Sequence, residues 1–159
     1  MCEIRTFPRV NLSTMLFDFE TKPGAYAVVV AGAQILLVFS PEHDAWTLPG
    51  GGLNFGEDPL AGVEREVFEE TGLRVVVDNL LGSFVSAYPD GLADSPGPVE
   101  VLRLIYQASV VDGELTNEVS GSTSKAEWFP TEEVSRLRTH SMIDPSLRLF
   151  LERPANGRP

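Results

Sequence analysis

The segment from residue 51 to residue 73, GGLNFGEDPLAGVEREVFEETGL, constrains this chain most, because it predicts one well-bounded helix that is crowded with carboxylates. Asp58 suits a helix N-cap, and Pro59 suits the first helical position, where its missing N–H costs nothing. Gly72 predicts the helix end, since glycine readily takes the left-handed conformation just past a C-terminus. A helix is therefore expected between Asp58 and Gly72.

The predicted helix has an apolar stripe with an acidic edge. The stripe consists of residues that recur at spacings of three and four, namely Leu60, Val63, Val67 and Thr71. At about 100° per residue, Glu66, Glu69 and Glu70 share a sector beside this stripe. Like charges at such spacings, close to a helix C-terminus, destabilise the helix by about a few tenths of a kcal/mol each. Arg65 offsets part of this repulsion by pairing with Glu69 at i,i+4.

A bound cation is one explanation for the acidic edge. Mg²⁺ and Mn²⁺ prefer oxygen ligands, which carboxylates supply, whereas the alternative is a solvated acidic face. Glycine-rich turns at residues 48–52 (LPGGG) and 54–56 (NFG) precede the helix. Glycines let a backbone approach a ligand closely, although they also occur in ordinary strand-to-helix turns. The combination of a glycine-rich turn, a capped helix and clustered carboxylates favours a site that binds phosphate and a metal ion.

The spacing G-x5-E-x7-R-E-U-x-E-E-x-G-U, in which U is apolar, is that of the Nudix box. The chain resembles the Nudix hydrolase family at every patterned position, which are Gly51, Glu57, Arg65, Glu66, Val67, Glu69, Glu70, Gly72 and Leu73. Residues 46–51 (WTLPGG) and 127–129 (EWF) also resemble the family. This resemblance implies Mg²⁺-dependent hydrolysis of a diphosphate linkage in a nucleoside diphosphate joined to another group, with Mn²⁺ able to substitute.

The resemblance also implies roles for individual residues. The implied metal ligands are the Gly51 carbonyl, Glu57, Glu66, Glu69 and Glu70. The implied catalytic residues are Arg65, Glu66, Glu69, Glu70 and Glu118. Arg65 would orient the carboxylates through salt bridges. One of the helix carboxylates, or a glutamate outside the box, would orient or deprotonate the attacking water; Glu118 and Glu127 compete for this role, and Glu118 is favoured.

Substrate-binding candidates lie outside the helix. Arg103 interrupts the apolar strand VLRLIY and needs a partner or an anionic ligand, unless it faces solvent. Tyr88, Phe84 and Phe55 are candidates for stacking on the substrate, because loops and strand ends near the box carry them. His43 and His140 stand alone in the sequence, and neither is expected to be catalytic.

Pro89 follows the box at about the place where, in the family, a proline accompanies ADP-ribose and related nucleotide sugars. Residues 40–42 (SPE) lack the Arg or Lys that many relatives carry there and that could contact phosphate. Both features favour nucleotide sugars of the ADP-ribose type. The alternatives are a (deoxy)nucleoside triphosphate pyrophosphohydrolase and a non-catalytic nucleotide-binding sensor of the same fold; the complete box disfavours the sensor.

The alternation of strand and helix patterns predicts a single α/β domain, an α/β/α sandwich around a mixed sheet, which is also the fold that the resemblance implies. We expect an N-terminal extension at residues 1–23 with an edge strand near 15–19, a Nudix domain at 24–152, and a disordered tail at 153–159. Strands are expected at 25–30, 35–39, 74–77, 80–88, 99–111 and 128–129, and further helices at 131–137 and 145–152.

The net charge of −11 and the pI near 4.5 argue against a nucleic-acid partner, since such proteins normally carry a basic face. The single Cys2 excludes an internal disulfide framework. No apolar run approaches a membrane span, and the first residues have no apolar signal region. The sequence thus predicts a cytoplasmic protein with a small-molecule nucleotide substrate and no membrane contact; a homodimer is compatible with it.

Overall fold

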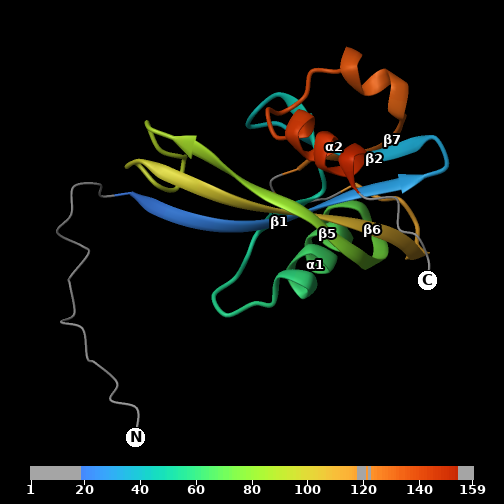
Figure 1. The fold of residues 1–159 in the computed structure, drawn as a ribbon, viewed down its shortest axis with the longest axis horizontal. Coiled ribbons are helices and arrows are strands. Elements are labelled where there is room, and N and C mark those ends of the chain that lie inside the picture. The colour runs from blue at the N-terminus through green and yellow to red at the C-terminus, as the bar shows by residue number, and fades with distance from the viewer. Residues whose placement is uncertain (1–18, 118–120, 122, 154–159) are drawn as a thin grey trace, which may run out of the picture.

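The computed structural model describes residues 19–117, 121 and 123–153. Within them, seven strands form one sheet, with helices on its two faces (Figure 1). The strands are β1 (Glu20–Ala31), β2 (Gln34–Ser40), β3 (Ala45–Thr47), β4 (Gly50–Gly52), β5 (Leu73–Tyr88), β6 (Val99–Gly113) and β7 (Lys125–Pro130). The helices are α1 (Pro59–Thr71), the 3₁₀ helix η2 (Thr131–Arg136) and α2 (Ile143–Glu152).

The sheet is mixed, as predicted. Its strand order is β3-β2-β1-β6-β5, while β4 pairs with β1 and β7 pairs with β2. The central pair β1–β6 is parallel, and the other described pairs are antiparallel. Helix α1 packs on one face against β1, β4 and β5, and α2 lies across the opposite face (Figure 1). The predicted α/β/α arrangement is therefore confirmed.

Strand β1 separates two apolar cores because its side chains alternate between the sheet faces. Ala25, Ala27 and Val29 join the core under α1, which contains Val63 and Val67. Val28 belongs to the second core, which also contains Ile35, Leu37, Leu48, Ile105, Val134, Met142 and Ile143. Burial on both faces explains why this strand reads as a nearly continuous apolar run.

Helix α1 begins and ends where the sequence predicts. The Asp58 carboxylate accepts hydrogen bonds from the N–H groups of Leu60 and Ala61, and Gly72 has a φ of 72°. Val63, Val67 and Thr71 are buried, but Leu60 is 46% exposed, so its place in the buried stripe was wrong. Leu53 from the preceding loop packs on this core beside Gly62, at the helix start.

Strand pairing extends several elements beyond their predicted limits. The two strands expected at 74–77 and 80–88 are one strand, β5, which follows β6 through register shifts near residues 77–82. The very short β3 and β4 were not predicted, because pairing with β2 and β1 defines them rather than any local pattern. The helix expected at 131–137 is a 3₁₀ helix.

The predicted edge strand lies outside the described residues apart from Phe19, and so does most of the predicted tail. The limits drawn for the extension, domain and tail stay predictions. In the described part of the chain, no helix is long and apolar enough to cross a membrane.

Candidate active site

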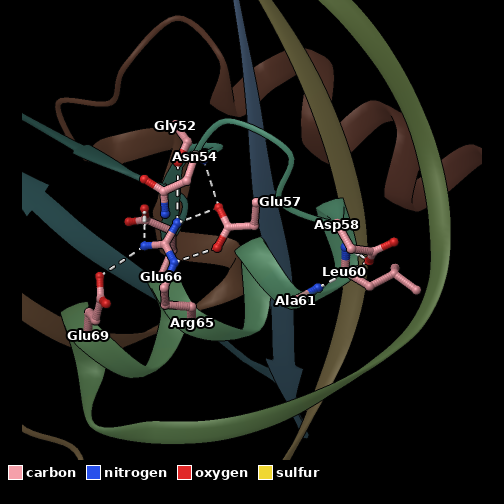
Figure 2. A network of polar contacts seen from close by, with 9 residues as sticks. All are labelled: Gly52, Asn54, Glu57, Asp58, Leu60, Ala61, Arg65, Glu66 and Glu69. Atoms are coloured by element: carbon pink, nitrogen blue, oxygen red, sulfur yellow. Dashed lines mark hydrogen bonds and ion pairs between the residues drawn. The ribbon is translucent and has the colours of Figure 1, made fainter.

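The side chain of Arg65 gathers three carboxylates beside α1, as Figure 2 shows. Its Nε and Nη2 donate to the two oxygens of Glu57 at 2.7 and 2.9 Å. Its Nη1 donates to Glu66 at 2.7 Å and to Glu69 at 3.1 Å. The predicted i,i+4 pair between Arg65 and Glu69 is thus confirmed, and a planar guanidinium is suited to such a fork of contacts.

These contacts keep the Glu57 carboxylate ionised. Hydrogen bonds from Arg65, and then from the Asn54 N–H, lower the pKa of Glu57 to about 2. The same hydrogen bonds, which Arg65 donates to Glu57, raise the pKa of Arg65, and the contact with Glu66 makes a smaller contribution. A carboxylate that receives charged donors favours its ionised form, so the Glu57 oxygens are acceptors at neutral pH.

Glu70 lies apart from this cluster and points toward β4. It is 2% exposed, and its Oε2 accepts a hydrogen bond from the Gly50 N–H at 2.8 Å. Gly50 has a φ of 135°, and a Cβ there would lie 2.3 Å from the Ala25 carbonyl oxygen. A residue with a side chain cannot take this position without strain, so glycine is needed for the contact.

The backbone of Gly51 lies against the Glu66 carboxylate. A Cβ at Gly51 would be 2.7 Å from Oε2 of Glu66, so a side chain would fill the space that separates β4 from α1. In the part of the chain that the structure describes, no three carboxylate, histidine or cysteine side chains are already spaced as a metal centre. The donors nevertheless fit a hard divalent ion, since they are oxygens crowded around a glycine backbone.

A pocket of about 430 Å³ opens beside β4 and Glu70. Its described lining comes from several elements and comprises Tyr26, Ser40, Glu42, His43, Thr47, Gly50, Gly51, Gly52, Glu70, Tyr88, Leu92, Ala93, Asp94, Val101, Arg103, Thr123, His140 and Met142. The pocket therefore joins one end of the carboxylate helix to the strand that carries Arg103.

Arg103 is buried in this pocket, with 5% of its surface exposed, so the solvent-facing alternative is wrong. Its Nε donates to the Ser86 hydroxyl at 3.0 Å, and its Nη2 donates to the Tyr88 hydroxyl at 2.7 Å. Its guanidinium also lies 5.0 Å from the centroid of the Tyr26 ring. Among the described residues, no carboxylate forms an ion pair with it.

The structure separates the aromatic candidates. Tyr88 lines the pocket, but Phe55 is fully exposed and does not. Phe84 pairs directly with Arg103 across β5 and β6, yet it packs on the core beneath α2 and lines a different hollow with Pro145. Phe55 and Phe84 are therefore not brought to the pocket, the first because its loop turns outward and the second because α2 covers it.

Of the two candidates for an additional catalytic glutamate, the structure describes only Glu127. Glu118 lies outside the described residues, so its predicted role stays a prediction. Glu127 on β7 pairs with Lys125 at 2.7 Å and does not line the pocket. Glu57 and Glu69 likewise do not line it; Arg65 holds both beside α1.

His43 and His140 form a pair that the sequence did not suggest. Their rings meet edge to face at 4.7 Å, and both line the pocket. Burial, with contributions from Arg103 and His43, lowers the pKa of His140 to about 4. The pair forms because Trp46 and Thr139 form a parallel bridge between distant segments, a contact with no local sequence signal.

The class of protein is defined by a mixed sheet between helices, with a carboxylate helix and a glycine strand that border one pocket. The family model described as the NUDIX domain matches residues 20–150, and the chain belongs to the Nudix family. It is a hydrolase acting on diphosphate-containing substrates, and members of this family generally use a divalent metal ion.

Three similar proteins illustrate the relationship. A MutT-like protein from Streptomyces ambofaciens is 31% identical over 72% of this chain and 71% of its own length. The diphosphoinositol polyphosphate phosphohydrolase 3-beta of Bos taurus is 44% identical over 69% of this chain, which spans 63% of that protein. The crystal structure of a MutT protein from Bacillus halodurans has a TM-score of 0.65 at 27% identity, covering 83% of each chain.

Proposed function

We propose that this chain hydrolyses the diphosphate linkage of nucleotide sugars of the ADP-ribose type, with Mg²⁺ as the preferred ion. The observation that carries this proposal is Arg103, a buried guanidinium in the pocket that also contains Glu70. Its hydrogen-bond partners among the described residues are uncharged, namely Ser86, Tyr88 and the sulfur of Met142. A buried charge costs several kcal/mol unless an opposite charge compensates it, so this position favours an anionic ligand.

The box residues have distinct tasks in this proposal. Gly51, through its carbonyl, and Glu57, Glu66, Glu69 and Glu70 would hold the divalent ion. When bound, such an ion neutralises phosphate charge and lowers the pKa of the attacking water.

The chain's own contacts prepare this arrangement. Arg65 holds Glu57, Glu66 and Glu69 in place through ion pairs, while the Gly50 N–H orients Glu70. Arg103 would bind a phosphate oxygen of the diphosphate. A carboxylate of the box, or Glu118, would accept the proton of the attacking water.

The charge balance of the pocket supports a diphosphate rather than a longer phosphate chain. Among its described lining residues, Arg103 is the one Lys or Arg, whereas Glu42, Glu70 and Asp94 are acidic. With a pKa near 4, His140 is neutral at physiological pH and adds no positive charge. A triphosphate, or an inositol ring with many phosphates, would bring charge that this lining does not offset.

One wall of the pocket supports a sugar joined to the diphosphate. Leu92, Ala93 and Asp94, from the loop that follows Pro89, form part of this wall. Asp94 offers a carboxylate that can accept hydrogen bonds from sugar hydroxyls.

A phosphate-release screen with Mg²⁺ tests the proposal. ADP-ribose and other nucleotide sugars, dinucleotides, (deoxy)nucleoside triphosphates and diphosphoinositol polyphosphates are compared by kcat/KM, with phosphatase or pyrophosphatase coupling. Nucleotide sugars are expected to give the highest value. A tenfold preference for deoxynucleoside triphosphates would contradict the substrate assignment. If the protein binds some of these compounds but hydrolyses none of them, the catalytic role is contradicted.

A further inference from the structure

The loop between β5 and β6, residues 89–98, has a regular internal turn and forms part of the pocket wall. Leu92 and Ser95 exchange two backbone hydrogen bonds, at 2.8 and 2.9 Å, which close a tight turn. Gly91 begins this turn with a φ of 85°, and a Cβ there would lie 2.2 Å from the Ser95 carbonyl oxygen. The loop thus has a defined internal structure, and Asp94 within it lines the pocket.

Three contacts fasten this loop to the start of β1. Lys22 Nζ donates to the Asp94 carboxylate at 2.7 Å. The Ser95 hydroxyl donates to the Glu20 carboxylate at 2.5 Å, and the Glu20 N–H donates to the Pro98 carbonyl at 3.0 Å. Glu20 and Lys22 are two residues apart on one strand, so their side chains project from the same face toward the loop.

These contacts form a small network rather than one isolated ion pair. Ser95 is buried, with 7% of its surface exposed, and the Lys22 side chain is 25% exposed, whereas the Asp94 and Glu20 side chains are 76% and 55% exposed. Lys22 also lies 3.9 Å from Glu20, so one ammonium serves both acidic partners. The hydrogen bond from Lys22 lowers the pKa of Asp94, which keeps that pocket-facing carboxylate ionised.

We propose that Lys22 and Glu20 are positioning residues that set the affinity for the sugar part of the substrate by fixing the residue 89–98 loop against β1. Neither residue lines the pocket; each acts through Asp94 or Ser95. This inference rests on the proposed function for its substrate, but the fastening of the loop can be measured without any substrate. The box helix is a separate element, so the chemical step stays unchanged.

The test compares the Mg²⁺-loaded wild type with Lys22→Met, Ser95→Ala, the double variant and the conservative Lys22→Arg. Lys125→Met is the matched control, because Lys125 forms an equally short 2.7 Å pair with Glu127 outside the pocket. The first readout is amide hydrogen exchange in residues 89–98. The second is the separation of KM from kcat with ADP-ribose.

We expect Lys22→Met and Ser95→Ala each to speed exchange in the loop and to raise KM about two- to five-fold, the range for a contact of this kind. Their kcat should stay within twofold of wild type, Lys22→Arg should restore KM, and Lys125→Met should change neither readout. Unchanged exchange and KM in the double variant would overturn the inference while leaving the hydrolase assignment intact. If the variants show faster exchange in the loop but the wild type does not cleave ADP-ribose, the fastening is supported and the proposed substrate is rejected.

Discussion

The Gly50 N–H donates a 2.8 Å hydrogen bond to the buried Glu70 carboxylate, and so joins the first residue of β4 to the last turn of α1. These residues are 20 positions apart, and the bond fixes one carboxylate oxygen toward the pocket. Since a side chain at position 50 would collide with β1, the contact depends on glycine.

Glu70→Gln should abolish most of the activity without unfolding the protein. The amide oxygen of glutamine can still accept the Gly50 hydrogen bond, but the negative charge that a divalent ion needs is lost. We expect kcat for the preferred substrate to fall by at least about 100-fold. Phosphate release under saturating Mg²⁺, with circular dichroism as the folding control, checks this; near wild-type turnover would reject the metal-binding role.

Arg65→Lys should lower kcat by about 10- to 100-fold, the usual range when a residue that orients metal ligands is lost. An ammonium cannot reproduce the two-pronged contact with Glu57 while also bonding Glu66 and Glu69. Arg74→Lys is the matched control, since Arg74 stacks on Phe68 and makes none of these contacts. Equal kinetic effects of the two substitutions would contradict the orienting role.

Mg²⁺ should raise the melting temperature, because an ion that binds only the folded protein stabilises it by mass action. A hundredfold excess over the dissociation constant corresponds to about 2.7 kcal/mol, or about 5 to 10 °C for a chain of this size. Differential scanning fluorimetry across a metal titration measures this. Glu70→Gln should blunt the rise, and a flat titration of the wild type would show that these carboxylates do not hold the ion.

Arg103→Met should raise KM for the substrate by about 10- to 100-fold, the value of one or two hydrogen bonds to a charged group. Its melting temperature should not fall, because methionine removes a buried charge that has no acidic partner among the described residues. Arg138→Met is the control, since Arg138 is exposed and pairs with Asp44. A large loss of stability with unchanged KM would show that Arg103 serves the fold alone.

Because of His140, the free energy of unfolding should rise with pH between about 4 and 6.5. Burial lowers its pKa from 6.5 to about 4, so in this window the unfolded chain binds a proton that the folded chain does not. Stability is therefore complete above pH 6.5 and declines as the pH falls toward 4. Urea titrations at several pH values give the free energy of unfolding at each pH. Between about pH 4 and 6.5 this free energy should change less steeply with pH for His140→Gln than for the wild type. An identical pH dependence of the two proteins would contradict the lowered pKa of His140.

The carboxylate helix could be predicted from the sequence because its determinants are local. Asp58 and Gly72 define its ends through contacts within a few residues, and Arg65 reaches Glu69 across one turn. The mixed sheet between helices also followed from the succession of apolar runs and from the family pattern. These features depend on neighbours along the chain, which a sequence displays directly.

The pocket depended on tertiary structure. Which face of a strand is buried, and what covers it, is decided by pairing between distant segments, so Arg103 became a pocket residue while its cross-strand partner Phe84 lies beneath α2. His43 and His140 met for the same reason, through the bridge between Trp46 and Thr139. The sequence by itself thus determined the carboxylate helix, whereas the folded sheet decided which residues surround the pocket, because a pocket is built from contacts between distant segments that leave no local pattern.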